Sequence, residues 1–152
     1  MSEVQTILKM IETVDQSDTT TLDEIDARVW CWLRGYTMRK PPQPPTSGDP
    51  GLFSYQSDLC KINFGRVEFT IIHYTRSRDA LKKIRPQGSY WFKACQHPDG
   101  YGFCEAGLIG GDPKMLIFRN HAATEELAEL HAIIQAIDHD RLNVRQPELA
   151  AN

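Results

Sequence analysis

Residues 73–104, HYTRSRDALKKIRPQGSYWFKACQHPDGYGFC, carry a helix start, a Pro-Gly break and a hairpin signal in direct succession. Ser77 is placed to cap a short helix whose buried edge consists of Ala80, Leu81 and Ile84. The proline and the glycine that follow end this helix, because neither favours a continued helical backbone. The stretch therefore predicts one short helix that leads directly into a β-hairpin.

The hairpin is predicted from two β-type segments, 90–96 and 101–108, on either side of the turn string His-Pro-Asp-Gly. In this turn, Pro98 presets φ at the first corner and Gly100 accepts a positive φ at the last. Because side chains alternate along a strand, the first segment presents two different faces. One face carries Tyr90, Phe92 and Ala94, and the other carries Trp91, Lys93 and Cys95.

Two helices are predicted before this stretch. Ser2 caps an amphipathic helix over about residues 3–14. Thr21 and Glu24 form a capping box for a second helix, which ends at Gly35 as a C-cap. The second helix is apolar on more than one side, so we expect it to have neighbours on two sides.

The remaining elements surround a proline-rich segment. Residues 39–51 hold five prolines and predict a surface loop, with an SH3-type ligand as the less common interpretation. Alternating apolar residues over 59–73 predict another hairpin. Residues 115–118 predict a short strand, Thr124 caps a last amphipathic helix, and residues 146–152 are expected to form a flexible tail.

The predicted fold is α+β, with a mainly antiparallel sheet of four to six strands that is sandwiched by helices or packed against them. A length of 152 residues fits one domain, which we place at residues 1–145. The two N-terminal helices are too short to enclose a core of their own, so they belong to this domain.

Composition narrows the class of protein. Apolar residues make up 41% and charged residues 24% of the chain, as in ordinary soluble globular proteins. No apolar run approaches the roughly 20 residues that span a bilayer, and the N-terminus lacks the features of a signal peptide. We therefore expect a cytoplasmic location. The net charge of -3 disfavours nucleic acid or an anionic membrane as a partner of the whole molecule, so only a local patch could bind either.

The four cysteines, Cys31, Cys60, Cys95 and Cys104, show no CxxC spacing and are predicted to be reduced, buried thiols. A zinc site built from Cys95, Cys104 and His97 is the alternative, although it has no clear fourth ligand. No metal and no cofactor are predicted. No catalytic residue is predicted either, because no nucleophile lies in a recognisable catalytic motif.

A cluster of basic and aromatic residues is the best candidate for a binding surface. If the Trp91 face of the hairpin is open, it would suit a nucleotide or a single-stranded nucleic acid. Arg76 and Arg78, at the start of a helix, could hold a phosphate, and a concave nucleotide site would join them to Trp91, Arg119 and His121. The predicted ligand- or partner-binding residues are Arg76, Arg78, Lys82, Lys83, Arg85, Trp91, Lys93, Arg119 and His121.

The order of these motifs resembles the phage ABA sandwich domain family, which consists of small proteins of phage and prophage sequences. The resemblance rests on YTRSRDA at 74–80, PQG at 86–88, the hairpin, and the AAT cap at 122–124. It covers residues 22–36 and 74–137, and leaves out the first helix and the proline-rich loop with its added hairpin. The resemblance implies a sheet between layers of helices and a phage or prophage source. It implies no known activity and no catalytic residue.

The function expected from these observations is that of a phage or prophage accessory protein that acts by non-enzymatic binding. Its specific form would be a counter-defence inhibitor of a host immune complex. The partner would be a host protein or ribonucleoprotein complex in the cytoplasm of the bacterial host, and no membrane partner is expected. The first alternative is a protein that binds and sequesters a nucleotide signal, and the second is a small enzyme of unknown type.

Overall fold

The computed structural model describes the backbone of residues 1–35, 37–38, 52–56, 61–64, 67–70, 72–111 and 118–151. Side chains are described for residues 1–35, 72–111 and 118–142. The predicted loop at 39–51 and Cys60 therefore lie outside the described residues. No described helix is both long and apolar enough to cross a membrane.

The described chain contains four helices: α1 (Glu3–Thr13), α2 (Thr19–Arg34), α3 (Arg78–Ile84) and α4 (Glu125–Ala151). The predicted caps at Ser2, Ser77 and Thr124 are confirmed, because each side chain accepts a hydrogen bond from a backbone amide three residues on. The predicted start of α2 is wrong. Its N-cap is Asp18, whose carboxylate accepts hydrogen bonds from both the backbone amide and the hydroxyl group of Thr21.

The helix ends also follow local signals. Gly35 ends α2 in the left-handed conformation with φ of 73°, as predicted for a glycine C-cap. Helix α4 continues to Ala151, across the segment for which a flexible tail is predicted.

The described residues contain seven strands, which lie in two sheets. The first consists of β1 (Thr37–Met38), β2 (Leu52–Gln56), β3 (Lys61–Phe64) and β4 (Val67–Thr70), and the second of β5 (Tyr90–Gln96), β6 (Gly102–Leu108) and β7 (Phe118–Ala122). The α+β class is confirmed, but a single sheet of four to six strands is not.

Both predicted hairpins are present, as the antiparallel pairs β3–β4 and β5–β6. The amide of His97 donates to the carbonyl of Tyr101 at 2.8 Å and closes the second hairpin. Strand β7 begins at Phe118, where the predicted strand at 115–118 was expected to end. Residues 115–117 lie outside the described residues.

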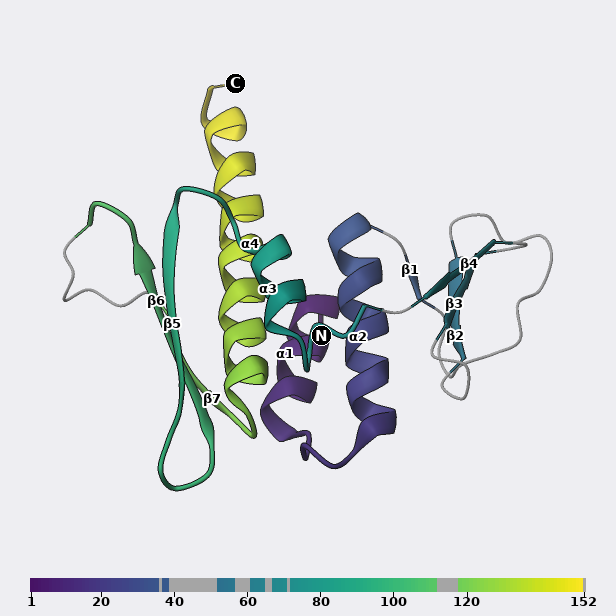
Figure 1. Ribbon diagram of the computed structural model, residues 1–152. Helices are drawn as coiled ribbons and strands as arrows, with labels where there is room; N and C mark the ends of the chain where they lie inside the picture. The colour runs from purple at the N-terminus through teal and green to yellow at the C-terminus, as the bar shows by residue number, and fades with distance from the viewer. Residues whose placement is uncertain are drawn as a thin grey trace.

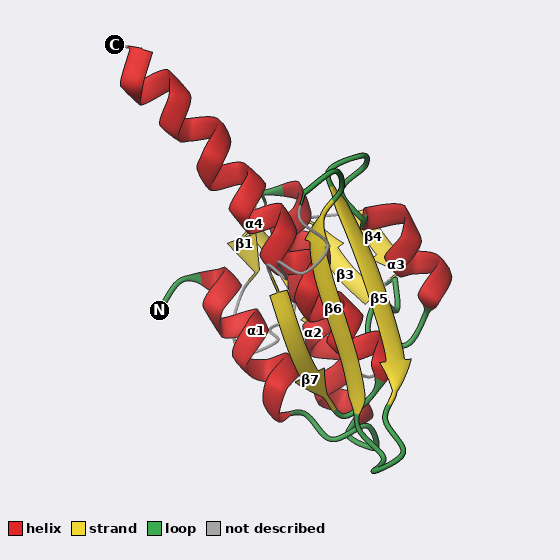
Figure 2. Cartoon of the chain, turned by 90° about the vertical axis from the view of Figure 1, so that its left-hand side faces the viewer, coloured by secondary structure: helices red, strands yellow, loops and turns green. Residues whose placement is uncertain are grey.

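The three-stranded sheet β5–β6–β7 has helices on one side. Helix α4 packs along all three strands, α1 contacts both α4 and β7, and α2 and α3 lie on the same side of the sheet (Figure 1). Figure 2 shows the sheet from its other side, which no described helix or strand covers. We call this side the outer face. The described helices thus cover one side of this three-stranded sheet, so the described residues do not form a sheet between two layers of helices.

The core lies between α4, the other helices and the inner face of this sheet. Small residues on β6, Cys104 and Ala106, are fully buried there and let α4 approach closely. The backbones come very close at Gly102, where an added Cβ would overlap the backbone carbonyl of Thr124, next to the start of α4. The large side chains that are fully buried are Ile7, Ile11, Ile25, Val29, Leu81, Leu127, Leu130, Ile133 and Ile134.

This approach predicts the effect of one methyl group. We expect Gly102→Ala to lower the free energy of unfolding by about 1–3 kcal/mol, because a rigid backbone leaves no room for the Cβ. Gly111→Ala is the matched control, since its Cβ would lie 3.5 Å from its nearest neighbour, an ordinary contact. Urea unfolding of both variants tests this. Equal stability of the two variants would contradict the assigned packing.

Candidate functional site

The buried carboxylate of Asp26 joins α2 to the turn before α3. Its Oδ1 accepts a hydrogen bond from the backbone amide of Thr75 at 2.8 Å, and its Oδ2 accepts one from the hydroxyl of Thr75 at 3.1 Å. Arg76 Nη2 also donates to Oδ2, at 3.0 Å. Burial raises the pKa of Asp26, and the hydrogen bonds from Thr75 and Arg76 only partly oppose this effect. The residue is therefore a structural anchor that sequence patterns did not reveal.

Arg76 is the cationic centre of the same cluster. Its Nη2 contacts the carboxylates of Asp23 and Asp26 and lies 2.7 Å from Nδ1 of His73. Burial lowers the pKa of Arg76, but its hydrogen bonds to the two carboxylates outweigh burial and raise it. Arg76 therefore stays charged and serves to balance two acids of the chain itself.

The same three partners have the spacing of a metal site. The ligand atoms of Asp23, Asp26 and His73 all lie within 4.8 Å of one another. However, Nη2 of Arg76 already lies among these atoms and supplies the positive charge that a metal ion would bring. The geometry fits an ionic lock better than a metal centre.

The other predicted arginines also face acids of the chain. Arg78 pairs with Glu125 at the start of α4, and Arg85 pairs with the buried carboxylate of Glu129. Arg119 lies 3.9 Å from Glu105 on the neighbouring strand. The structure thus directs Arg76 toward α2 and Arg78 toward α4, so it does not bring them together around a phosphate before α3.

Strand register decides which predicted residues share the outer face. Trp91 lies opposite Gly107, Lys93 opposite Glu105, and Glu105 in turn opposite Arg119. The next row along the strands holds Cys95, Phe103 and His121. Trp91 and His121 are therefore on one face but in rows about 13 Å apart, at roughly 3.3 Å per residue. The concave site predicted to join them to Arg76 and Arg78 is not formed.

Aromatic rings form a continuous group at one end of the outer face. The rings of His97 and Tyr101 stack at 4.4 Å, and Tyr101 meets His121 edge-on at 5.2 Å. The ring of Phe103 lies 5.3 Å from that of His121, and the guanidinium of Arg119 lies 5.4 Å above Phe103. Phe103 and Tyr101 were not among the predicted binding residues. Counting outward from the predicted turn, which pairs His97 with Tyr101, would have placed Phe103 beside Cys95.

At the other end of the outer face, the indole of Trp91 covers Gly107. A Cβ on Gly107 would lie 2.7 Å from the ring of Trp91, so the absence of a side chain there lets the indole lie flat on β6. Tyr90, Phe92 and Ala94 point the other way, toward the helices, and Tyr90 donates a hydrogen bond to Asp140 of α4 at 2.7 Å. The predicted division of β5 into two faces is correct.

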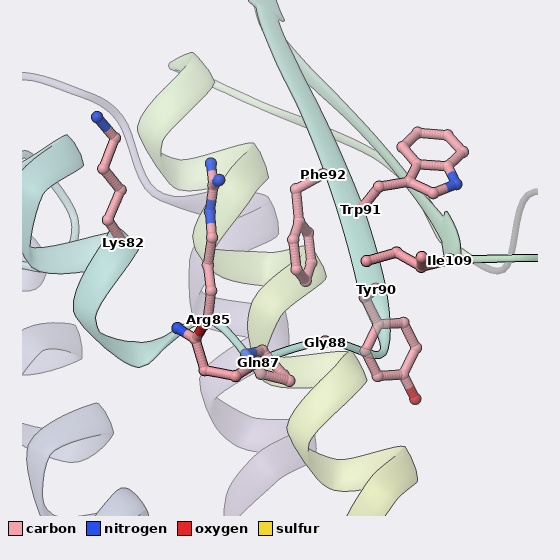
Figure 3. A pocket seen from close by; sticks show the side chains of 9 residues that line it. Lys82, Arg85, Gln87, Gly88, Tyr90, Trp91, Phe92 and Ile109 are labelled. Carbon is pink, nitrogen blue, oxygen red and sulfur yellow. The ribbon is translucent and has the colours of Figure 1, made fainter.

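A groove lies beside β5, on the side away from β6. It has a volume of about 430 Å³ and runs between α3 and the strand, with the turn that connects them closing one end (Figure 3). Lys82 and Arg85 extend from α3 along one wall, and Arg85 lies 5.5 Å from the ring of Phe92. We call this the α3–β5 groove. Its lining residues are Lys82, Arg85, Pro86, Gln87, Gly88, Tyr90, Trp91, Phe92 and Ile109.

Lys83 does not belong to this groove. It lines a separate hollow of about 480 Å³ on the opposite side of α3, together with Arg34, Tyr74 and Asp79. Two adjacent lysines of one helix therefore face different surfaces of the protein.

The cysteines are placed in two environments. Cys31 and Cys104 are buried as predicted, and burial raises the pKa of Cys31 to about 12 and that of Cys104 to about 11, so both thiols stay protonated near neutral pH. The prediction of burial is wrong for Cys95, which is exposed on the outer face. Cys95 and Cys104 point to opposite faces of adjacent strands, so they do not form the alternative zinc site with His97.

Comparisons of the chain with protein-family models, with curated proteins and with solved structures gave no match. The resemblance to the phage ABA sandwich domain family therefore stays a prediction from the sequence. The function has to be argued from the geometry of the outer face and of the groove.

The Asp26 anchor predicts a specific titration. We expect the carboxyl of Asp26 to titrate above the ordinary aspartate value of about 3.9, and that of Asp18 below it, because Thr21 donates two hydrogen bonds to Asp18. Carbon-13 NMR of the side-chain carboxyls against pH measures both in one sample. Arg76→Gln should raise the pKa of Asp26 further, because it removes a nearby cation. A pKa of Asp26 at or below that of Asp18 would contradict this account.

The sign of the effect on stability follows from the same shift. A pKa that is higher in the folded than in the unfolded protein gives stability that is fully present below the unfolded value. That stability is lost as the pH rises through the folded value. As the pH rises from the unfolded to the folded pKa of Asp26, we therefore expect the unfolding free energy of Asp26→Asn to fall less than that of the unmodified protein. Urea unfolding measures both. Parallel pH profiles would contradict this expectation.

Proposed function

We propose that the protein is a non-enzymatic binding protein that holds a short segment of single-stranded nucleic acid on its outer face. One observation carries the proposal. A sheet face without described cover presents the rings of Trp91, Tyr101 and Phe103 beside the cations of Lys93 and Arg119. Aromatic rings on an open surface next to basic side chains are what single-stranded nucleic acids use for stacking and for phosphate contact.

The best position for a stacked base is over Phe103. Its ring is half-buried, so it is held in place, and His121 lies beside it. The exposed guanidinium of Arg119, which lies 5.4 Å above the ring, has to move aside for the base. A base that stacks on this ring brings its phosphate close to the Arg119 guanidinium. Stacking on one aromatic ring contributes about 1–3 kcal/mol per base, so a single ring is sufficient for a measurable effect.

The charge of the outer face limits the length of the bound segment. In its central row, the acidic side chain of Glu105 lies between the basic side chains of Lys93 and Arg119, so the net positive charge of this face is small. The rest of the molecule is acidic, with a net charge of -3 for the whole chain. A long polyanion would therefore be repelled beyond the sheet, and a short, stacked segment fits better.

The partner that we propose is nucleic acid within a host ribonucleoprotein complex. The support is the phage or prophage source that the sequence resemblance implies, together with the small size of the chain. A small phage protein of this kind would act by binding to a host immune complex. Capture of a free nucleotide signal is the alternative use of the same rings. The two are distinguished by length, since a signal binder should prefer a mononucleotide to an oligonucleotide.

The proposal is tested by fluorescence anisotropy with labelled ten-nucleotide polyuridine and polythymidine at low salt. We expect saturable binding, with Phe103→Ala weakening it at least fivefold, which corresponds to the loss of about 1 kcal/mol of stacking. Arg119→Ala should weaken binding and reduce the slope of log affinity against log salt by about 0.7.

Arg34→Ala is the matched control, because Arg34 also lies over an aromatic ring, that of Trp30, but on α2. This variant should bind as the unmodified protein does. The proposal fails if no oligonucleotide binds, or if Arg34→Ala and Arg119→Ala have equal effects. Tighter binding of mononucleotides than of the oligonucleotides would favour the signal-binding alternative instead.

A further inference from the structure

The α3–β5 groove is distinct from the surface that the proposed function uses, and only Trp91 borders both. We propose that this groove binds an extended acidic peptide, which pairs with β5 as an additional strand of the sheet. Strand addition needs an unpaired edge, room beside it, and side chains that select the incoming chain. The described residues supply all three.

The edge is provided by β5, which is the end strand of the sheet. The amide of Ile109 donates to the carbonyl of Ser89 at 3.0 Å, and His97 pairs in the same way with Tyr101. Odd-numbered residues of β5 therefore direct their backbone groups toward β6, and the backbone groups of Tyr90, Phe92 and Ala94 point away from it. Within the described residues these groups have no hydrogen-bond partner, so they can pair with another strand.

The room is provided by the path of the chain between α3 and β5. The Pro86–Gly88 turn carries the backbone away from the strand edge before it enters β5, and Gly88 has φ of 80°, which favours glycine. As Figure 3 shows, α3, this turn and β5 surround the groove on three sides. Its volume of about 430 Å³ is open between the helix and the edge strand.

Charge selects the incoming chain. Lys82 lies on α3 and Arg85 is the residue that ends this helix, and both side chains line the groove. Lys82 is exposed and has no ion-pair partner among the described residues. Arg85 pairs with Glu129 through Nη2, and 32% of its side chain is exposed. An acidic side chain that points toward the helices would meet these two cations.

The opposite side of the incoming strand meets apolar surface. Trp91 and Ile109 lie on the far side of β5 from Arg85, and Ile109 is 58% exposed. Because side chains of a strand alternate between its two sides, the peptide should alternate acidic residues, which contact Lys82 and Arg85, with apolar residues, which contact Trp91 and Ile109. This pattern defines the class of ligand.

A second copy of the chain is a poor occupant for the same reason. The sequence of β5, YWFKACQ, contains one cation and no acid. If two copies paired through β5, Lys82 and Lys93 of both copies, which have no ion-pair partner among the described residues, would be brought together, which is unfavourable. Charge therefore favours an acidic peptide over self-association.

The test uses fluorescein-labelled eight-residue peptides and fluorescence anisotropy. We expect a peptide with alternating Glu and Val to bind saturably and a peptide with alternating Lys and Val to bind at least tenfold more weakly. Methylation of alternate backbone nitrogens should abolish binding for one of the two alternating sets and leave it intact for the other, because only one set faces β5. Equal binding of both methylated peptides would exclude strand addition.

Two pairs of variants locate the site. Lys82→Glu should weaken binding at least fivefold, whereas Lys83→Glu, which changes a lysine of the separate hollow, should not. Ala94→Pro removes an amide that points away from β6 and should abolish binding while the unfolding free energy changes little. Phe103→Ala, on the outer face, should bind the peptide normally, so this proposal and the nucleic-acid proposal fail separately.

Three further results would overturn the inference. These are an absence of binding of the Glu-Val peptide, equal effects of Lys82→Glu and Lys83→Glu, and a dimer in light scattering that Ala94→Pro converts to a monomer. The last result would identify a second copy of the chain as the occupant of the edge.

Discussion

The buried carboxylate of Asp26 connects two parts of the chain that are 49 residues apart at its contact with Thr75. A buried charge without partners would cost several kcal/mol, so Thr75 and Arg76 have to remain where they meet it. They form the turn from which α3 begins, and α3 leads directly into β5. The positions of the α3–β5 groove and of the outer face both depend on this contact. A change at Asp26 is therefore expected to act on distant surfaces through the turn, without touching them.

The same requirement explains why a basic stretch of sequence does not become a basic patch. Arg76, Arg78 and Arg85 compensate acids on α2 and α4, and the guanidinium group suits such fixed, multiply hydrogen-bonded pairs. Lys82 and Lys93 have no ion-pair partner among the described residues, and both are exposed. Unpaired positive charge on this surface thus comes from these two lysines, and not from the arginines that are most prominent in the basic stretch of sequence. An arginine count taken from the sequence overstates the charge that a ligand would meet.

Local signals in the sequence predicted local structure well. The caps at Ser77 and Thr124, the glycine end of α2 and the turn at residues 97–100 depend on neighbouring residues alone, and the structure confirms them. The division into two sheets and the burial of Asp26 depend on contacts between distant segments, for which a single sequence holds no signal. Phe103 is an intermediate case, because its place follows from the hairpin register that the turn already implied. The candidate site was thus predictable in part. The sequence identified β5 with Trp91 and Lys93, but it did not identify Phe103, which lies on the neighbouring strand β6.

A sheet with helices on only one side has to make its other face compatible with water. Charged residues achieve this in the central row of Lys93, Glu105 and Arg119, where the cross-strand acid also limits the net charge. The rows on either side carry Trp91, Phe103 and His121, which solvation alone would not select. The edge strand β5 likewise carries one lysine but no proline or bulge to block pairing along its length. The aromatic rings of the outer face and the unpaired backbone groups of β5 therefore have one property in common. Neither is needed for the packing of the described core, and in our two proposals each binds a different kind of extended chain.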